Sequence, residues 1–132
     1  QNINPDTPNK EENLKKGLVH MTFMADIYRR QVEVGRLFLH EQPKTATSWK
    51  LGVIQRISDL PGVRRVDCDQ CAYGLVAEDV DGVAPVLKPT GWLTNSEFIA
   101  AELQLRCKGC ARHCNLMRRT SNETWRVIER YP

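Results

Sequence analysis

Two cysteine pairs with the same internal spacing constrain this chain more than any other feature. Two residues separate Cys68 from Cys71 and Cys107 from Cys110, and His113 follows the second pair closely. Zinc takes four nitrogen or sulfur ligands in a tetrahedron, and the C-x2-C spacing lets one turn present two thiolates to one ion. A shared ion would therefore tie together two segments that are far apart in the sequence.

The second pair opens a predicted zinc knuckle at 107–114. Its expected ligands form a set of four: Cys71, Cys107, Cys110 and His113. Cys68 and Cys114 are alternative ligands. Strand alternation would turn Cys68 the same way as Val66, which would instead make it a core thiol. The competing interpretation is that all these thiols are unliganded. Four protein ligands leave no open coordination position, so such a zinc would be structural.

Length and composition agree with one domain that binds no membrane. The chain has 132 residues, 41% of them hydrophobic, and a formal net charge of +3. No apolar run approaches the roughly 20 residues of a membrane helix. Five cysteines with no secretion-signal pattern favour reduced or metal-bound thiols and an intracellular location, nuclear or cytoplasmic. The mild positive charge permits nucleic-acid binding without requiring it.

The order of predicted elements indicates an α/β domain. Residues 1–10 are expected to form a flexible arm, and residues 11–132 a single domain. The apolar spacing predicts helices from Glu11 to Gly35, at 48–60 and at 97–105, strands at 37–41, 63–67 and, interrupted, at 86–95, a hairpin around Asp81-Gly82, and a helix or strand at 123–129. Segments of this kind alternate in α/β proteins.

A short apolar run that ends in two polar residues is the first candidate for chemistry. Leu37 to Leu39 resemble a buried strand, His40 and Glu41 follow, and Pro43 ends the run. Catalytic and binding groups are often placed where a buried strand enters a loop. Glu41 could exchange a proton with a substrate. The alternative is that Glu41 caps a helix or pairs with an arginine, and that His40 is a hydrogen-bonded structural group.

Three other groups could contact nucleic acid or metal. Asp67 and Asp69 could join Glu41 in a metal-dependent nuclease, or could lie in a solvated turn. Lys88 and Thr90 offer a cation and a hydroxyl that suit a phosphate. A tail of basic and aromatic residues could bind nucleic acid or be an ordinary solvated surface. It consists of Arg118, Arg119, Trp125, Arg126, Arg130 and Tyr131.

Several longer motifs are shared with one group of proteins. The runs GRLFLHEQPKTATSW, DCDQCAYG, LKPTGWLTNS and RCKGCARHC, with the closing YP, occur in this order from Gly35 to Pro132. Together they resemble a segment of the polyproteins of eukaryotic mobile elements. The chain departs from that segment at Gln42, where the family usually has His, and in its extra cysteines at Cys68, Cys110 and Cys114. The family's knuckle is also usually richer in His.

A more distant resemblance is to the second half of DNA cytosine-5 methyltransferases, in which a strand ending in Glu-Asn precedes a helix. It implies a small Rossmann-like half-domain, with a central sheet of about four strands between flanking helices. It also implies that Glu41 is the catalytic carboxylate and that a flipped base is the substrate. His40, Tyr73, Lys88 and Thr90 are then expected to bind that substrate.

The resemblance to methyltransferases covers only part of such an enzyme. The Gly-rich loop and the Pro-Cys nucleophile of the first half have no counterpart in residues 1–36. S-adenosylmethionine would therefore require a second polypeptide or a missing upstream half. The sequence thus predicts a domain that binds or modifies nucleic acid, most simply DNA, and that is inactive alone. The alternatives are a non-catalytic zinc-binding interaction module and the nuclease.

Overall fold

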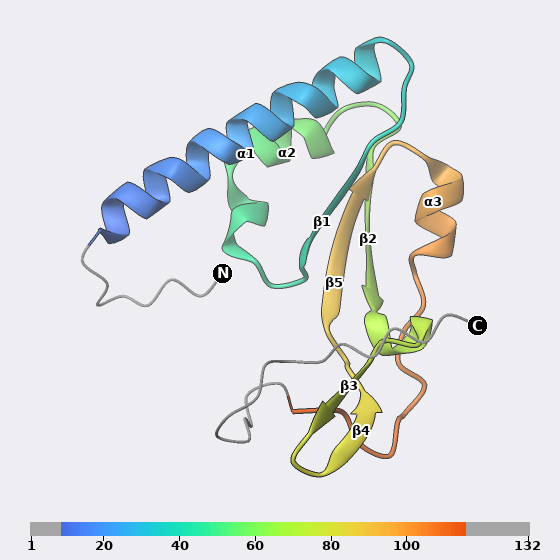
Figure 1. Ribbon diagram of the computed structural model, residues 1–132. Coiled ribbons are helices and arrows are strands. Elements are labelled where there is room, and N and C mark those ends of the chain that lie inside the picture. Colours follow the sequence, from blue (N-terminus) through green and yellow to red (C-terminus); the bar gives the residue numbers. More distant parts are fainter. Residues whose placement is uncertain (1–8, 116–132) are drawn as a thin grey trace.

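The computed structural model describes residues 9–115 and contains helices, a small sheet and a separate hairpin (Figure 1). The helices are α1 (Lys10–Glu33), α2 (Gly52–Ser58) and α3 (Glu97–Glu102), with single 3-10 turns η1 (Thr47–Lys50) and η2 (Gln70–Tyr73). The strands are β1 (Leu39–Pro43), β2 (Arg64–Asp69), β3 (Val76–Asp79), β4 (Gly82–Pro85) and β5 (Pro89–Thr94).

The main sheet has three antiparallel strands in the order β1-β5-β2. Strand β5 is the central one, and its Leu93 pairs with His40 of β1 and with Arg65 of β2. Strands β3 and β4 form a hairpin of their own. The predicted mixed α/β class is confirmed. The sheet has three strands instead of about four, because the hairpin pairs only with itself.

The Rossmann-like part of the prediction is not confirmed. A Rossmann unit joins parallel strands through a crossover helix, whereas β5 pairs antiparallel with both of its neighbours. Several element boundaries also differ from the predictions. The strand expected at 37–41 is Leu39–Pro43, and the helix expected at 97–105 ends at Glu102. The helix expected at 48–60 is divided at Leu51, whose backbone is extended. The strand expected at 86–95 begins only at Pro89, because Val86 instead donates its N–H to the carbonyl of Leu75, next to the β3–β4 hairpin.

Helix α1 and helix α2 cover one face of the sheet. Met21, Ala25 and Tyr28 form the buried stripe of α1, and the ring of Tyr28 stacks on Phe38 with centroids 4.6 Å apart. These residues share a core with one aromatic ring and three aliphatic side chains from η1, α2 and β5: Trp49, Ile54, Ile57 and Leu93. Helix α3 packs against the other face, on β5 and β2.

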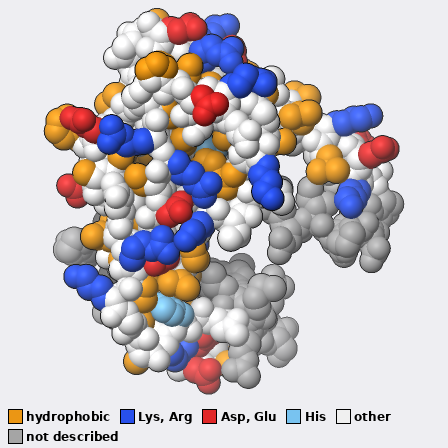
Figure 2. Space-filling view, turned by 180° about the vertical axis from the view of Figure 1, so that it is seen from behind, with side chains coloured by type: hydrophobic (Ala, Val, Ile, Leu, Met, Phe, Trp, Pro, Cys, Tyr) orange, Lys and Arg blue, Asp and Glu red, His pale blue; other side chains and the backbone are white. Residues whose placement is uncertain are grey.

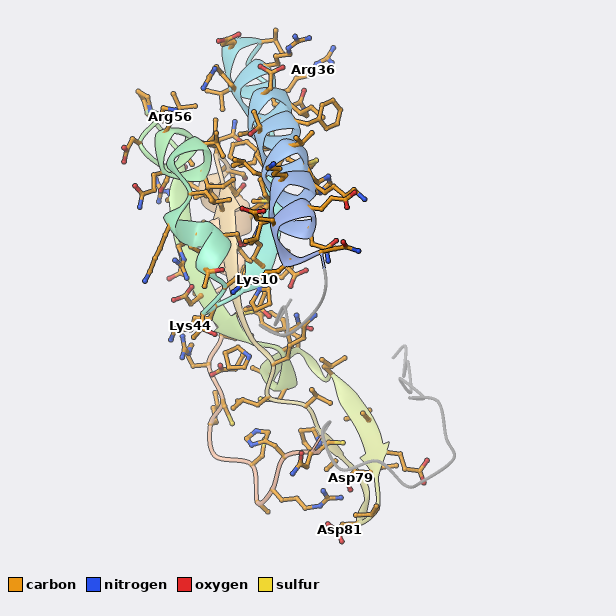
Figure 3. All side chains as sticks on the ribbon, turned by 90° about the vertical axis from the view of Figure 1, so that its left-hand side faces the viewer. Lys10, Arg36, Lys44, Arg56, Asp79 and Asp81 are labelled. Atoms are coloured by element: carbon orange, nitrogen blue, oxygen red, sulfur yellow. The ribbon has the colours of Figure 1, made fainter. Side chains whose placement is uncertain are left out.

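A second, much smaller core lies at the opposite end of the molecule. It consists of Ala77, Ala84, Val86 and Cys114, with Leu75 packed against them. Figure 3 shows the separation: Arg36 and Arg56 lie at the helical end, and Asp79 and Asp81 at the tip of the β3–β4 hairpin. We call this second part, residues 70–87 and 105–115, the hairpin lobe.

Some predictions fall outside the part that the structure describes. They are most of the arm at 1–10, the segment at 123–129 and the basic tail. The single-domain boundary of 11–132 therefore stays a prediction. Within residues 9–115, no helix combines the length and the apolar character needed to cross a membrane.

Gly91 is required where the sheet meets Trp49. A Cβ at Gly91 would lie 2.8 Å from Cζ2 of Trp49, whose ring is held by a hydrogen bond from Nε1 to the carbonyl of Pro43. The guanidinium of Arg65 lies on the same ring, 4.1 Å from its centroid. The ring is therefore fixed from two sides and cannot easily move away from an added methyl group.

We expect Gly91→Ala to destabilise the protein by about 1–3 kcal/mol, the usual cost of overpacking. Gly17→Ala is the control: its Cβ meets no atom within 4 Å, and it should instead stabilise the helix by about 0.5–1 kcal/mol. Denaturant unfolding measures both effects. Equal stability of the two variants would contradict this account of Trp49.

Candidate metal centre

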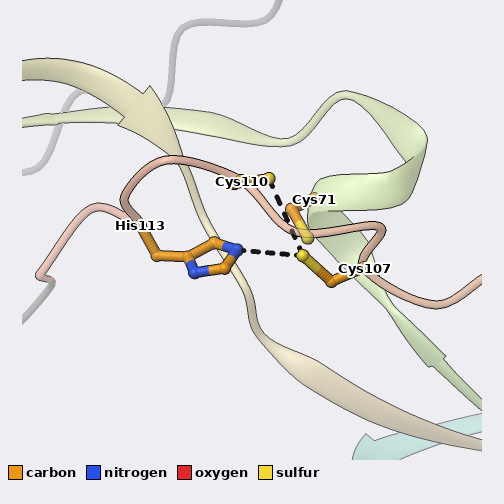
Figure 4. A group of neighbouring side chains, drawn as sticks. All are labelled: Cys71, Cys107, Cys110 and His113. Carbon is orange, nitrogen blue, oxygen red and sulfur yellow. Dashed lines mark hydrogen bonds between the residues drawn. The ribbon is translucent and has the colours of Figure 1, made fainter.

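Three cysteines and a histidine from two separate segments meet between η2 and the loop after α3 (Figure 4). The ligand atoms of Cys71, Cys107, Cys110 and His113 all lie within 4.8 Å of one another. These are the four residues predicted as the metal ligands. The loop after α3 supplies three of them, and η2 supplies Cys71.

The distances within the group match a tetrahedral site. The Sγ atoms of Cys107 and Cys110 are 3.7 Å apart, and Cys107 Sγ lies 3.4 Å from Nε2 of His113. Zinc–sulfur bonds of about 2.3 Å and zinc–nitrogen bonds of about 2.0–2.1 Å give tetrahedral edges of about 3.8 Å and 3.5 Å. The side chains are thus arranged to hold an ion of this size with little movement.

Backbone geometry presents these ligands. Gly109 lies between two of them with φ 95°, and Gly74 ends η2 with φ 85°. Both are left-handed conformations that glycine adopts without a Cβ penalty. The chain can therefore turn sharply after Cys107 and return Cys110 to the same point.

The carboxylate of Asp69 fixes the start of the knuckle. Asp69 is buried, and its Oδ2 accepts hydrogen bonds from the backbone N–H of Cys107 (2.9 Å) and from Nε of Arg106 (3.1 Å). The backbone N–H of Asp69 donates in turn to the carbonyl of Leu105. Partners of this kind orient metal ligands without touching the metal.

The carboxylate of Asp79 fixes the end of the knuckle to the hairpin. Its Oδ2 accepts from Nη1 of Arg112 (2.9 Å) and from the backbone N–H of Asn115 (2.8 Å). Arg112 also donates to the carbonyl of Gly82. The hydrogen bond from Arg112 holds the pKa of Asp79 well below its ordinary range, so this anchor is charged throughout the neutral range.

The three thiols differ in acidity. Backbone hydrogen bonds from Cys110 and Gly109 lower the pKa of Cys107 to about 6. Burial raises the pKa of Cys71 to about 12, and the side-chain hydrogen bond with Cys107 raises the pKa of Cys110. Cys107 is therefore the most acidic thiol of the group, and a divalent cation would displace the protons of the others.

The two alternative cysteines occupy cores. Cys68 is buried in β2, and its Sγ accepts a hydrogen bond from Nε1 of Trp92 at 3.1 Å. Cys114 is buried among the apolar side chains of the hairpin lobe, and burial raises its pKa. Neither belongs to the group of four.

Two of the predicted substrate-site residues lie together. Lys88 Nζ is 3.7 Å from Oε1 of Glu41, and both side chains are substantially exposed. Trp92, directly opposite Glu41 in the sheet, is half-buried. Lys88 itself has φ 29°, a left-handed conformation that is strained for a residue with a side chain.

The structure separates the other three from this pair. His40 is buried on the opposite face of β1, where its Nδ1 is 2.7 Å from the hydroxyl of Tyr28. Thr90 is fully buried and bonds Gln70 and the carbonyl of Lys88. The hydroxyl of Tyr73 joins α3 to the loop that follows it, through the carbonyl of Glu102 and the N–H of Leu105. Their predicted contact with a substrate stays a prediction.

The carboxylates of the nuclease hypothesis do not converge. Asp67 pairs with Lys44 and Arg65, and Asp69 serves the knuckle. Among residues 9–115, the cysteine and histidine group is the one place where three or more such ligands lie close enough to share an ion. The structure therefore does not bring Glu41, Asp67 and Asp69 together around a shared ion, and the nuclease hypothesis stays a prediction.

The sequence did not reveal the anchoring roles of Asp69, Asp79 and Arg112. Each acts on a residue more than thirty positions away, and no local pattern distinguishes such a carboxylate from one in a solvated turn. The C-x2-C spacing was the only signal near them.

Removal of metal with a chelator should loosen the hairpin lobe and leave the main sheet folded, because the lobe has few buried apolar side chains of its own. Hydrogen exchange measures this directly. The amides of Val86 and Cys114, which bond across the lobe, should lose protection, while those between β1 and β5 keep it. Equal loss in both regions, or in neither, would contradict this expectation.

No family model matches this sequence, and neither a curated protein nor a solved structure matches it. What the chain does must therefore be inferred from its own side chains.

Proposed function

We propose that the chain is a non-catalytic interaction module whose hairpin lobe is held in shape by one structural zinc ion. The observation that carries this proposal is the convergence of Cys71, Cys107, Cys110 and His113 within 4.8 Å. Three thiolates and one imidazole are a donor set that zinc takes in structural sites. All four positions would be filled by protein, which leaves none for a substrate.

The choice of zinc follows from ligand chemistry. Soft thiolates select zinc over magnesium or calcium, which prefer oxygen ligands. The knuckle contains no carboxylate ligand, because the carboxylates of Asp69 and Asp79 are used by backbone and arginine donors. The role of the ion would be to connect η2 to the knuckle and thereby to close the hairpin lobe.

Metal titration of single-cysteine variants tests this proposal. Cys110→Ser removes an exposed ligand and should lower zinc affinity by more than the roughly 10–100-fold that loss of an outer partner costs. Cys68→Ala is the matched control, since this thiol lies in the main sheet, and it should bind one zinc as the wild type does. Competition with a chromophoric chelator gives the affinities.

A different result would reject the proposal. If Cys110→Ser binds zinc as tightly as the wild type, this group is not the site. Cobalt substitution provides an independent check, because tetrahedral thiolate ligation gives characteristic visible absorption. Cys68→Ala should keep that spectrum, and Cys110→Ser should change it.

Nucleic acid is the second candidate, as the partner of the module. The observation in its favour is the exposed pair of Glu41 and Lys88, with strained backbone at Lys88. Strained residues cluster at functional sites, and an exposed cation suits a phosphate. Basic side chains elsewhere alternate with acidic ones on the face shown in Figure 2, so the contact would be local.

The resemblance to mobile-element polyproteins and to cytosine methyltransferases belongs to this second candidate. Under it, Glu41 would hold the edge of a cytosine, and S-adenosylmethionine would come from a partner polypeptide. The main support from the chain's own geometry is that Glu41, in the middle of β1, has an exposed side chain.

Fluorescence anisotropy with labelled single-stranded and duplex DNA tests the second candidate. Lys88→Ala should weaken binding severalfold at low salt and reduce its salt dependence by about one counterion. Lys50→Ala, an exposed lysine of η1, is the control and should bind as the wild type. Absence of binding by the zinc-loaded wild type at low salt would reject nucleic acid as the partner.

A further inference from the structure

The outer face of α1 contacts no other described element. Helix α1 packs its Met21, Ala25 and Tyr28 stripe against the core, and Figure 3 shows α2 and the sheet on that side only. On the opposite side, Val19 is 71% exposed and Phe23 is 61% exposed. Large apolar side chains that stand together on a surface mark an interaction site.

Charged residues flank this apolar centre in a fixed order. At the amino-terminal side Lys16 pairs with Glu12 at 3.0 Å, and at the carboxy-terminal side Arg30 pairs with Asp26 at 3.3 Å, all well exposed. Successive spacings of four and three residues place these groups on one helix face, as in the seam of a coiled coil. The face consists, in order, of Glu12, Lys16, Val19, Phe23, Asp26 and Arg30.

This order is complementary to itself when reversed. If a second α1 lies antiparallel, Glu12 stands opposite Arg30 and Lys16 opposite Asp26, while Val19 meets Phe23 at the centre. A parallel, in-register pair would instead place each charge opposite its like. Each charge in the antiparallel arrangement has an opposite charge both along its own helix and across the interface. A two-fold interface requires self-complementarity of this kind.

We propose that two copies of this chain associate through the outer faces of their α1 helices, antiparallel, with Val19 and Phe23 at the centre. The partner that the face fits is thus a second copy. The interface is one helix seam, below the area of an obligate dimer, so the association is reversible and depends on concentration. It lies far from the knuckle and does not depend on the proposed zinc site.

Sedimentation velocity of the zinc-loaded full chain over a concentration series tests the association. The wild type should shift from monomer to dimer, and Phe23→Asp should weaken the dimer at least tenfold. Phe98→Asp removes an exposed phenylalanine of α3 that is 79% exposed and should leave the dimer unchanged. A wild type that stays monomeric, or a dimer that Phe23→Asp leaves intact, would overturn the proposal.

Charge reversal tests the register. Lys16→Glu and Asp26→Lys should each weaken self-association, because each places like charges opposite one another. An equimolar mixture of the two variants should recover a dimer, because Glu at position 16 then faces Lys at position 26 and the other pair is native. Failure of the mixture to recover, with both variants folded by circular dichroism, would reject the antiparallel register.

Cross-linking gives a direct readout. A zero-length carbodiimide should join Lys16 to Asp26 in the dimer, and the product must be intermolecular because ten helical residues separate the two by about 15 Å. The Lys16–Glu12 link within one helix is the internal control. Formation of the internal link without the Lys16–Asp26 link would also overturn the proposal.

Discussion

The hairpin lobe depends on a connection that its apolar side chains cannot provide. Its core contains two alanines, a valine and a cysteine, with Leu75 packed against them. The area that such small side chains remove from water is modest, and small units of this kind usually need a metal or a disulfide. The convergence of Cys71 with Cys107, Cys110 and His113 supplies the means for a metal connection.

The main sheet has the opposite character. Its core is built from large side chains of α1, η1, α2 and β5. The polar groups of Tyr28 and His40 are buried there and contact each other. His40 interacts with the Tyr28 hydroxyl, and burial lowers its pKa. Asp69 connects this sheet to the hairpin lobe. It is the last residue of β2, and its carboxylate accepts from the N–H of Cys107 at the start of the knuckle. The stable part thereby positions the weaker part.

The same helix contributes to the interior and to a free surface. The inner stripe of α1 is used by the core, while Val19 and Phe23 on its outer face remain exposed. A helix with apolar groups on both sides is normally buried on both. The arrangement of charges around the outer stripe distinguishes one occupant, a second copy, from an unspecified apolar partner.

The sequence by itself determined the features that local spacing controls. The apolar spacing located α1, Pro43 marked the end of β1, and Asp81-Gly82 marked the β3–β4 turn. The C-x2-C spacing with His113 named the four residues that meet. Only the tertiary structure decided how the strands pair, that Cys114 lies in a core, and that His40 contacts Tyr28 while Glu41 pairs with Lys88. It also decided that Asp69 and Asp79 hold the knuckle. The reason is physical: periodicity and turn chemistry act over a few residues, whereas strand order and these carboxylate contacts join residues twenty or more positions apart.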